Sequence, residues 1–194
     1  MGSRTGGARS ADAAPRWVAF LRAVNVGGRT VRMEELRGHF EALGYANVAT
    51  FIASGNVIFD TRDAERTLEA TIEKQLAKVL GFETAVFVRS AAALVDIART
   101  QAFPDVRSGG GGPTHYVAFL RDRPAAAAVR RVMALCSATD ELRVDGREVW
   151  WLCRGSMRES TVSGARLEKA LGSPVTVRNL NTIVRLVPRL GVTS

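Results

Sequence analysis

The residue types best suited to binding chemistry lie in short segments, each where a predicted strand ends. In the first segment, Arg22 ends an apolar strand, and Asn25, Gly27 and Gly28 follow it. A glycine pair admits positive φ, so successive backbone N–H groups could form a nest for an anion, with the Arg22 guanidinium close by. The alternative is a tight turn that needs glycine for steric reasons alone.

Two further segments carry polar side chains in the same setting. Ser54 and Asn56 stand in the turn of a predicted hairpin, although both residue types favour turns without any function. Arg178, Asn179 and Asn181 join the last predicted strand to the last helix, where Asn179 can cap the helix and an anion would be favoured. These segments together give nine candidate ligand-binding residues: Arg22, Asn25, Gly27, Gly28, Ser54, Asn56, Arg178, Asn179 and Asn181.

Residues for catalysis or metal binding form no recognisable pattern. The two histidines, His39 and His115, have no Cys or Asp beside them in the sequence, and Cys136 and Cys153 form no CxxC pair. Nucleotide-binding and hydrolase motifs are absent from the sequence. We therefore predict no catalytic residue, no metal ligand and no cofactor, and leave open whether the protein is an enzyme. The glutamates of the predicted helices, such as Glu69 and Glu73, are expected to be solvated.

Composition narrows the class of protein and of partner. The 194 residues are 46% hydrophobic and 24% charged, which excludes a disordered chain. No apolar run reaches the roughly 18 residues of a membrane span, and the N-terminus lacks the core of a signal peptide, so we expect a cytoplasmic protein. Two cysteines without a disulfide pattern agree with a reducing compartment.

The formal net charge of +8 is unevenly spread along the chain. Residues 17–103 carry ten basic and ten acidic side chains, whereas residues 104–194 carry fourteen and eight. An anionic partner should therefore meet the C-terminal half first. Nearly all basic residues are arginines, which suits phosphate recognition but can equally reflect a GC-rich genome.

Hydrophobic periodicity predicts the order strand, helix, strand, strand, helix, strand, and predicts it twice. The first set has strands over 17–22, 48–52, 57–60 and 84–89 and helices over 33–43 and 64–80, followed by a helix capped by Ser90. The second set has strands over 115–121, 142–144, 148–153 and 175–178, with helices over 124–137, up to Gly172, and after Asn179.

The two sets also share sequence. Val18–Arg22 recurs as Val117–Arg121, and Lys78–Gly81 resembles Lys169–Gly172, in the same order. We therefore predict an α+β protein built by internal duplication of two ferredoxin-like βαββαβ units, each an antiparallel sheet with helices packed on one face. The expected organisation is a disordered tail over 1–16, a first unit over 17–103, a Gly-rich linker over 104–113 and a second unit over 114–194.

Four segments together resemble one bacterial family, domain of unknown function 1697 (DUF1697). They are Phe20–Gly28, Met33–Arg37, Thr50–Val57 and Thr176–Thr182. The resemblance spans Trp17 to about Leu186 and implies a two-part ferredoxin-like architecture. It implies no established activity.

Three functions remain open from the sequence. The first is non-enzymatic binding of a small anionic ligand or nucleotide between the two units by the nine candidate residues. The second is a tandem nucleic-acid-binding module, because the strand order is that of the RNA-recognition motif, although the third strand lacks that motif's glycine and aromatics. Of Trp150 and Trp151, one should face the open side of a sheet, where it could stack a base or seal a contact. The third is an enzyme of unrecognised type.

Overall fold

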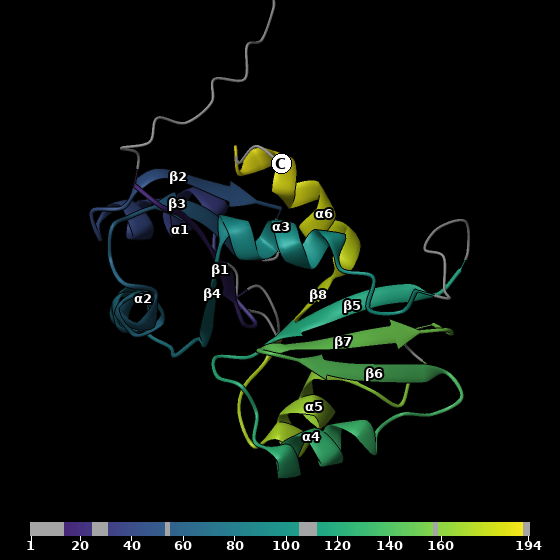
Figure 1. Ribbon diagram of the computed structural model, residues 1–194. Coiled ribbons are helices and arrows are strands. Elements are labelled where there is room, and N and C mark those ends of the chain that lie inside the picture. Colours follow the sequence, from purple (N-terminus) through teal and green to yellow (C-terminus); the bar gives the residue numbers. More distant parts are fainter. Residues whose placement is uncertain (1–13, 25–30, 53–54, 105–111, 157–158, 192–194) are drawn as a thin grey trace, which may run out of the picture. The chain divides into compact units, whose positions relative to one another are not determined.

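The computed structural model describes residues 14–24, 31–52, 55–104, 112–156 and 159–191. It divides into two compact units, Met1–Arg99 with Ile183–Ser194 and Thr100–Thr182. Each unit holds one four-stranded antiparallel sheet (Figure 1). The chain is thus an α+β protein with two similar sheet units, as the periodicity predicts.

The first unit follows the predicted order of elements. Its strands form a sheet in the order β2-β3-β1-β4. The elements are β1 (Arg16–Leu21), α1 (Met33–Glu41), β2 (Ala46–Phe51), β3 (Asn56–Asp60), α2 (Glu65–Leu80), β4 (Val86–Ser90) and α3 (Ala91–Arg99).

One face of this sheet packs against α1 and α2. Side chains alternate between the two faces of a strand, so Ala19 and Leu21 of β1 join Phe40 of α1 and Ile72 of α2 in one buried core. The opposite face is buried as well, since Val18 and other alternate residues are fully enclosed. The helix α3 contacts β1 and β4, and its buried residues lie outside the α1–α2 core. The expectation that helices cover one face alone is therefore wrong for this unit.

Both chain ends of the first unit differ from the predicted boundaries. Arg16, assigned to the tail, begins β1, and its guanidinium binds the Asp60 carboxylate through two nitrogens at 2.8 and 3.1 Å. Its remaining nitrogen donates to the carbonyl of Leu190 at 3.0 Å. Ile183 and Leu186 are fully buried, and residues 183–194 group with the first unit instead of the second. Their spacing predicts an amphipathic helix but cannot show which sheet the helix covers.

The second unit repeats the element order. Its sheet has the order β6-β7-β5-β8, so corresponding strands hold corresponding places in the two sheets. Figure 1 shows α4 and α5 side by side beneath this sheet. Its elements are β5 (Thr114–Phe119), α4 (Ala126–Met133), β6 (Asp140–Asp145), β7 (Glu148–Cys153), α5 (Gly164–Leu171) and β8 (Thr176–Asn179). The helix α6 (Leu180–Leu186) follows, and from Ile183 onward it groups with the first unit, as does the 3-10 helix η1 (Val187–Arg189).

Local sequence signals set several element ends as expected. The Ser90 hydroxyl accepts from the Ala93 N–H at 3.2 Å, and the Asn179 side chain accepts from the Asn181 N–H at 2.8 Å. Both side chains cap the helix that follows. The Gly-rich segment expected as a linker falls mostly on residues 105–111, outside the described part of the chain.

The division into units also changes the distribution of charge. Residues 100–182 carry twelve basic and eight acidic side chains, and residues 1–99 with 183–194 carry fifteen and eleven. Both units therefore have a formal net charge of +4. The expected asymmetry between a neutral and a basic unit is not present, because the tail and the C-terminal helix contribute their arginines to the first unit.

Candidate functional site

The two N-terminal motif segments meet at one end of the first sheet. The backbone N–H of Leu21, the last residue of β1, donates to the carbonyl of Gly55 in the β2–β3 turn at 2.8 Å. Val24, just beyond β1, is buried. A Cβ atom added at Gly55 would lie 3.3 Å from the Leu21 Cβ and 3.6 Å from the Val24 Cβ. These segments are far apart in sequence, and the pairing of β1 with β3 brings them into contact.

The main chain of Arg22 is anchored by the two residues that precede β4. Its N–H donates to the carbonyl of Ala85 at 2.9 Å, and its carbonyl accepts from the Thr84 hydroxyl at 2.6 Å. The residue is exposed in spite of this anchoring. A basic side chain thus stands at a defined position on the surface, at the end of the sheet where the two motif segments meet.

Left-handed backbone occurs on both sides of this meeting point. Ala23 has φ of 54° and Ile52 has φ of 51°, and Gly55 has φ of 74°. Positive φ is uncommon for Ala and a genuine outlier for a β-branched residue such as Ile. Each such residue costs about 1–3 kcal/mol and persists only where its surroundings enforce it, which occurs most often at ligand-binding positions.

The nine predicted site residues divide between the described and undescribed parts of the chain. Asn25, Gly27, Gly28 and Ser54 lie outside the described residues. Asn56 is fully buried, and its side-chain amide donates to the Phe51 carbonyl at 3.0 Å, which closes the hairpin from within. This hydrogen bond stabilises the turn.

The three C-terminal candidates lie on β8 and α6. Arg178 is half-buried, and one guanidinium nitrogen donates to the Thr176 hydroxyl at 2.8 Å and to the Val177 carbonyl at 2.9 Å. Burial lowers the pKa of Arg178 to about 10. Asn179 is the cap described above, which accounts for its polar side chain. Asn181 is exposed in the first turn of α6.

Arg178 has a counterpart in the first unit. In the strand registers, Arg178 pairs with Val117 of β5, and Arg89 of β4 pairs with Val18 of β1. Arg89 is fully buried, and like Arg178 it donates to the carbonyl of the preceding residue, at 2.8 Å. An arginine with the same backbone contact at the same register position of both sheets supports a structural role for Arg178.

A second polar cluster was not anticipated from the sequence. It surrounds Asp140, which is fully buried at the start of β6. The carboxylate accepts from Ser160 Oγ at 2.7 Å, Trp151 Nε1 at 2.8 Å, Thr139 Oγ1 at 3.0 Å and the Thr161 N–H at 3.2 Å. Burial raises the pKa of Asp140, but the hydrogen bonds outweigh it, so the pKa lies below its ordinary value.

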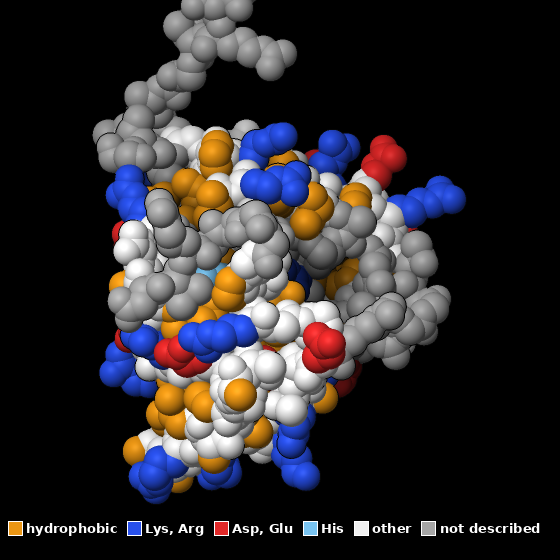
Figure 2. Space-filling model, turned by 90° about the vertical axis from the view of Figure 1, so that its right-hand side faces the viewer, with side chains coloured by type: hydrophobic (Ala, Val, Ile, Leu, Met, Phe, Trp, Pro, Cys, Tyr) orange, Lys and Arg blue, Asp and Glu red, His pale blue; other side chains and the backbone are white. Residues whose placement is uncertain are grey.

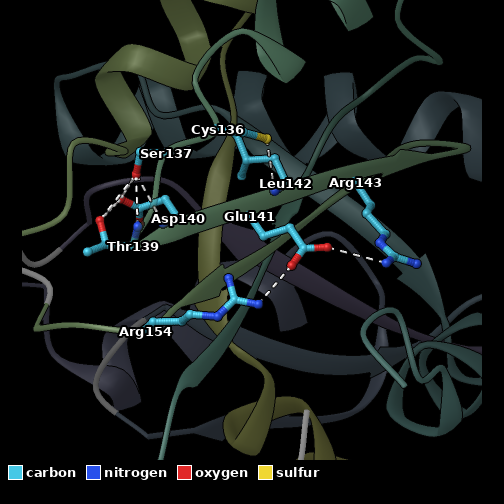
Figure 3. Close-up of polar contacts among 8 residues, drawn as sticks. All are labelled: Cys136, Ser137, Thr139, Asp140, Glu141, Leu142, Arg143 and Arg154. Carbon is cyan, nitrogen blue, oxygen red and sulfur yellow. Dashed lines mark hydrogen bonds and ion pairs between the residues drawn. The ribbon is translucent and has the colours of Figure 1, made fainter. Parts of the chain in front are cut away.

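The Asp140 cluster is a structural centre. Figure 3 shows Ser137 and Thr139 gathered around Asp140, while the neighbouring Glu141 reaches Arg143 and Arg154. The donors come from three segments, namely residues 137–139, Trp151 and residues 160–161, and they are hydroxyl, indole and amide groups. Within the described ranges, no group of three or more His, Cys, Asp or Glu side chains could hold a metal ion.

Both tryptophans of β7 are buried. On the face of β5 and β7 opposite the α4–α5 core, Val117, Phe119 and Trp150 are buried, whereas His115 and Glu148 are half-buried. Trp151 lies within the core. The expectation that one tryptophan faces an open side is therefore wrong. In the view of Figure 2, Lys and Arg side chains are scattered between Asp and Glu and form no continuous stripe.

Among the described helices, none is both long and apolar enough to cross a membrane.

A search of curated proteins finds no match to this chain. Among solved structures, the chain is similar to conserved bacterial protein SP0830 from Streptococcus pneumoniae, with 22% identity and a TM-score of 0.68. The similarity covers 92% of this chain and 99% of that protein, and it shows a shared fold.

The family comparison agrees with the motifs quoted above. Residues 15–150 match the family described as "Protein of unknown function (DUF1697)". This range includes three of the four motif segments and both loops that meet at Gly55. The chain belongs to the DUF1697 family.

Proposed function

We propose that the first unit binds a small anionic ligand at the end of its sheet where the two motif segments meet, with Arg22 supplying the positive charge. The observation that carries this proposal is the hydrogen bond between Leu21 and Gly55, which joins the two segments. Left-handed residues on both sides of the contact support it, because strain of this kind is retained where a specific backbone shape is needed.

The anchoring of Arg22 supports the same function. A charged side chain on a backbone that is held at both its N–H and its carbonyl loses less freedom when it binds a ligand. The guanidinium suits a carboxylate or phosphate, since it can offer two parallel N–H donors. Asn25, Gly27, Gly28 and Ser54 belong to the same two sequence segments and remain candidates for the site from the sequence alone.

We also infer that the chain arose by duplication of a ferredoxin-like unit. The matching strand orders β2-β3-β1-β4 and β6-β7-β5-β8 support this inference, as does the pairing of Arg89 and Arg178 at one register position. The repeated sequence Val18–Arg22 and Val117–Arg121 lies at the corresponding strand of each unit. The ligand proposal concerns the first unit by itself.

Thermal unfolding with a panel of anions tests the proposed function. The full chain is unfolded in the presence of inorganic phosphate, pyrophosphate, AMP and citrate, and compared with Arg22→Gln and Arg66→Gln. Arg66 is an exposed residue of α2 outside the proposed site, so R66Q is a matched loss of one charge. We expect at least one anion to raise the Tm of the wild type and of R66Q, and not of R22Q. A panel without any saturable shift, or an equal shift in R22Q, contradicts the proposal.

A further inference from the structure

A surface depression opens on the second unit, where the β5–α4 connection meets the β6–β7 turn. It encloses about 220 Å³ and is lined by Arg123, Pro124, Val129, Val144, Asp145 and Gly146. The N–H of Leu120 donates to the carbonyl of Arg147 at 2.8 Å and joins the two loops. None of the nine residues predicted from the sequence lines this depression.

The lining of the depression combines one basic, one acidic and three apolar side chains. Arg123 and Asp145 are both exposed, and neither forms an ion pair or side-chain hydrogen bond with another described residue. Pro124, Val129 and Val144 are half-buried, so each presents part of an apolar side chain. A ligand that neutralises both charges therefore needs an anionic group, a cationic group and a short apolar body.

The size of the depression favours a compact ligand. Its volume is about 220 Å³, and it is open to solvent on one side. An amino acid of the size of valine carries a carboxylate, an ammonium and a short apolar side chain, which match the basic, acidic and apolar residues of the lining.

We propose that this depression binds a small aliphatic α-amino acid. The carboxylate pairs with the Arg123 guanidinium, the ammonium pairs with the Asp145 carboxylate, and the side chain lies against Val129 and Val144. The site is separate from the proposed anion site, because it lies on the second unit and selects a zwitterion. It requires both charges at once, which excludes simple anions and simple amines.

Calorimetric titration of the full chain with L-valine tests this proposal. Isovalerate and isobutylamine serve as probes that keep only the carboxylate or only the ammonium. We expect saturable binding of valine and at least about tenfold weaker binding of either single-charge probe, since each loses one charge-assisted contact. If valine shows no saturation up to concentrations on the order of 10 mM, the proposal is overturned.

Two pairs of variants locate the binding. Arg123→Gln and Asp145→Asn should each weaken valine binding about tenfold or more. Arg130→Gln on α4 and Asp122→Asn beside the depression remove the same charges from exposed residues that do not line it, and should leave the affinity unchanged. Equal affinity in all four variants overturns the proposal. Retained Tm values in all four show that the changes act on binding and not on folding.

Amide NMR spectra separate this site from the one proposed on the first unit. Valine should shift the resonances of Gly146, Val129 and Val144 in the wild type and in R22Q alike. Shifts centred on Gly55 instead would place valine on the first unit and refute the assignment to the depression. Loss of the anion response in R22Q with unchanged valine binding would uphold both proposals, and either can fail without the other.

Discussion

The carboxylate of Glu69 on α2 accepts a hydrogen bond from the backbone N–H of Val88 on β4 at 2.9 Å. Four residues later on the same helix, Glu73 accepts from the N–H of Val86, also at 2.9 Å. β4 is an edge strand, and these N–H groups face away from its partner β1. An edge strand with open N–H groups can pair with another chain. The carboxylates of α2 accept hydrogen bonds from those N–H groups, so the groups are not open to a strand of another chain.

Replacing Glu69 with alanine should destabilise the fold, because the N–H of the fully buried Val88 would lose its acceptor. An unsatisfied buried donor costs about 1–3 kcal/mol of the free energy of unfolding. Urea denaturation of Glu69→Ala measures this loss. Glu69→Gln keeps an acceptor oxygen and should lose less. Glu83→Ala removes an exposed carboxylate and should stay within about 0.5 kcal/mol of the wild type. Similar values for E69A and E83A would contradict the assigned role.

Asp140 should make the stability of the protein depend on pH. Folding lowers the pKa of this carboxyl below its ordinary value of 3.8, because hydrogen bonds led by that from Ser160 outweigh its burial. A carboxyl with a lowered pKa stabilises the fold fully above its unfolded pKa and loses that contribution as the pH falls through its folded pKa. Asp140→Asn should therefore cost at least about 2 kcal/mol at neutral pH.

Urea denaturation of the wild type and D140N between about pH 7 and about pH 3 checks the sign. The difference in unfolding free energy between the two proteins should be constant near neutrality and shrink toward the acid end. Effects of the other titrating groups are common to both proteins and cancel in this difference. A difference that grows on acidification would contradict a lowered pKa for Asp140.

Trp151 and Asp140 should be energetically coupled, since the indole Nε1 donates to the carboxylate at 2.8 Å. Trp151→Phe removes the donor and keeps an aromatic ring in the core. In a double-mutant cycle with D140N, the interaction energy should be about 1 kcal/mol or more. Trp150→Phe is a matched control on the opposite face of β7, and its cycle with D140N should be additive within about 0.5 kcal/mol. Equal coupling for both tryptophans would show that the effect is not the hydrogen bond.

The order of elements could be predicted because each element carries its own signal. Leu68, Ile72 and Leu76 follow the helical period, and all three are buried on one face of α2. Gly81 ends that helix with φ of 74°, as a C-terminal glycine should. These signals are local, so no knowledge of the tertiary fold was needed to read them.

The polar contacts could not be predicted because they join segments that are distant in sequence. Glu69 and Glu73 have the spacing of a solvated helix face, and only the position of β4 makes them acceptors. Asp140 likewise gains its donors from Trp151 and Ser160, which the sheet and a later loop supply. The motifs place Arg22 and Gly55 in two separate sequence segments, and the contact between these segments follows from the pairing of β1 with β3.

Gly55 should be sensitive to substitution. Gly55→Ala places a Cβ at φ of 74° and only 3.3 Å from the Leu21 Cβ, in a contact between buried backbone segments. Gly81→Ala is a close control, since Gly81 also has φ of 74° but has nothing within 4 Å of an added Cβ. An alanine in left-handed backbone lowers the free energy of unfolding by about 1–2 kcal/mol in both variants. Only in G55A does the added Cβ also contact a neighbouring segment closely. Urea denaturation should therefore rank G55A below G81A in stability.

The rise in Tm caused by the anion should be smaller in G55A alone, because separating the two segments alters the site without removing Arg22. Equal stability and equal anion response in the two variants would show that the close approach of Leu21 and Gly55 matters neither to the fold nor to binding.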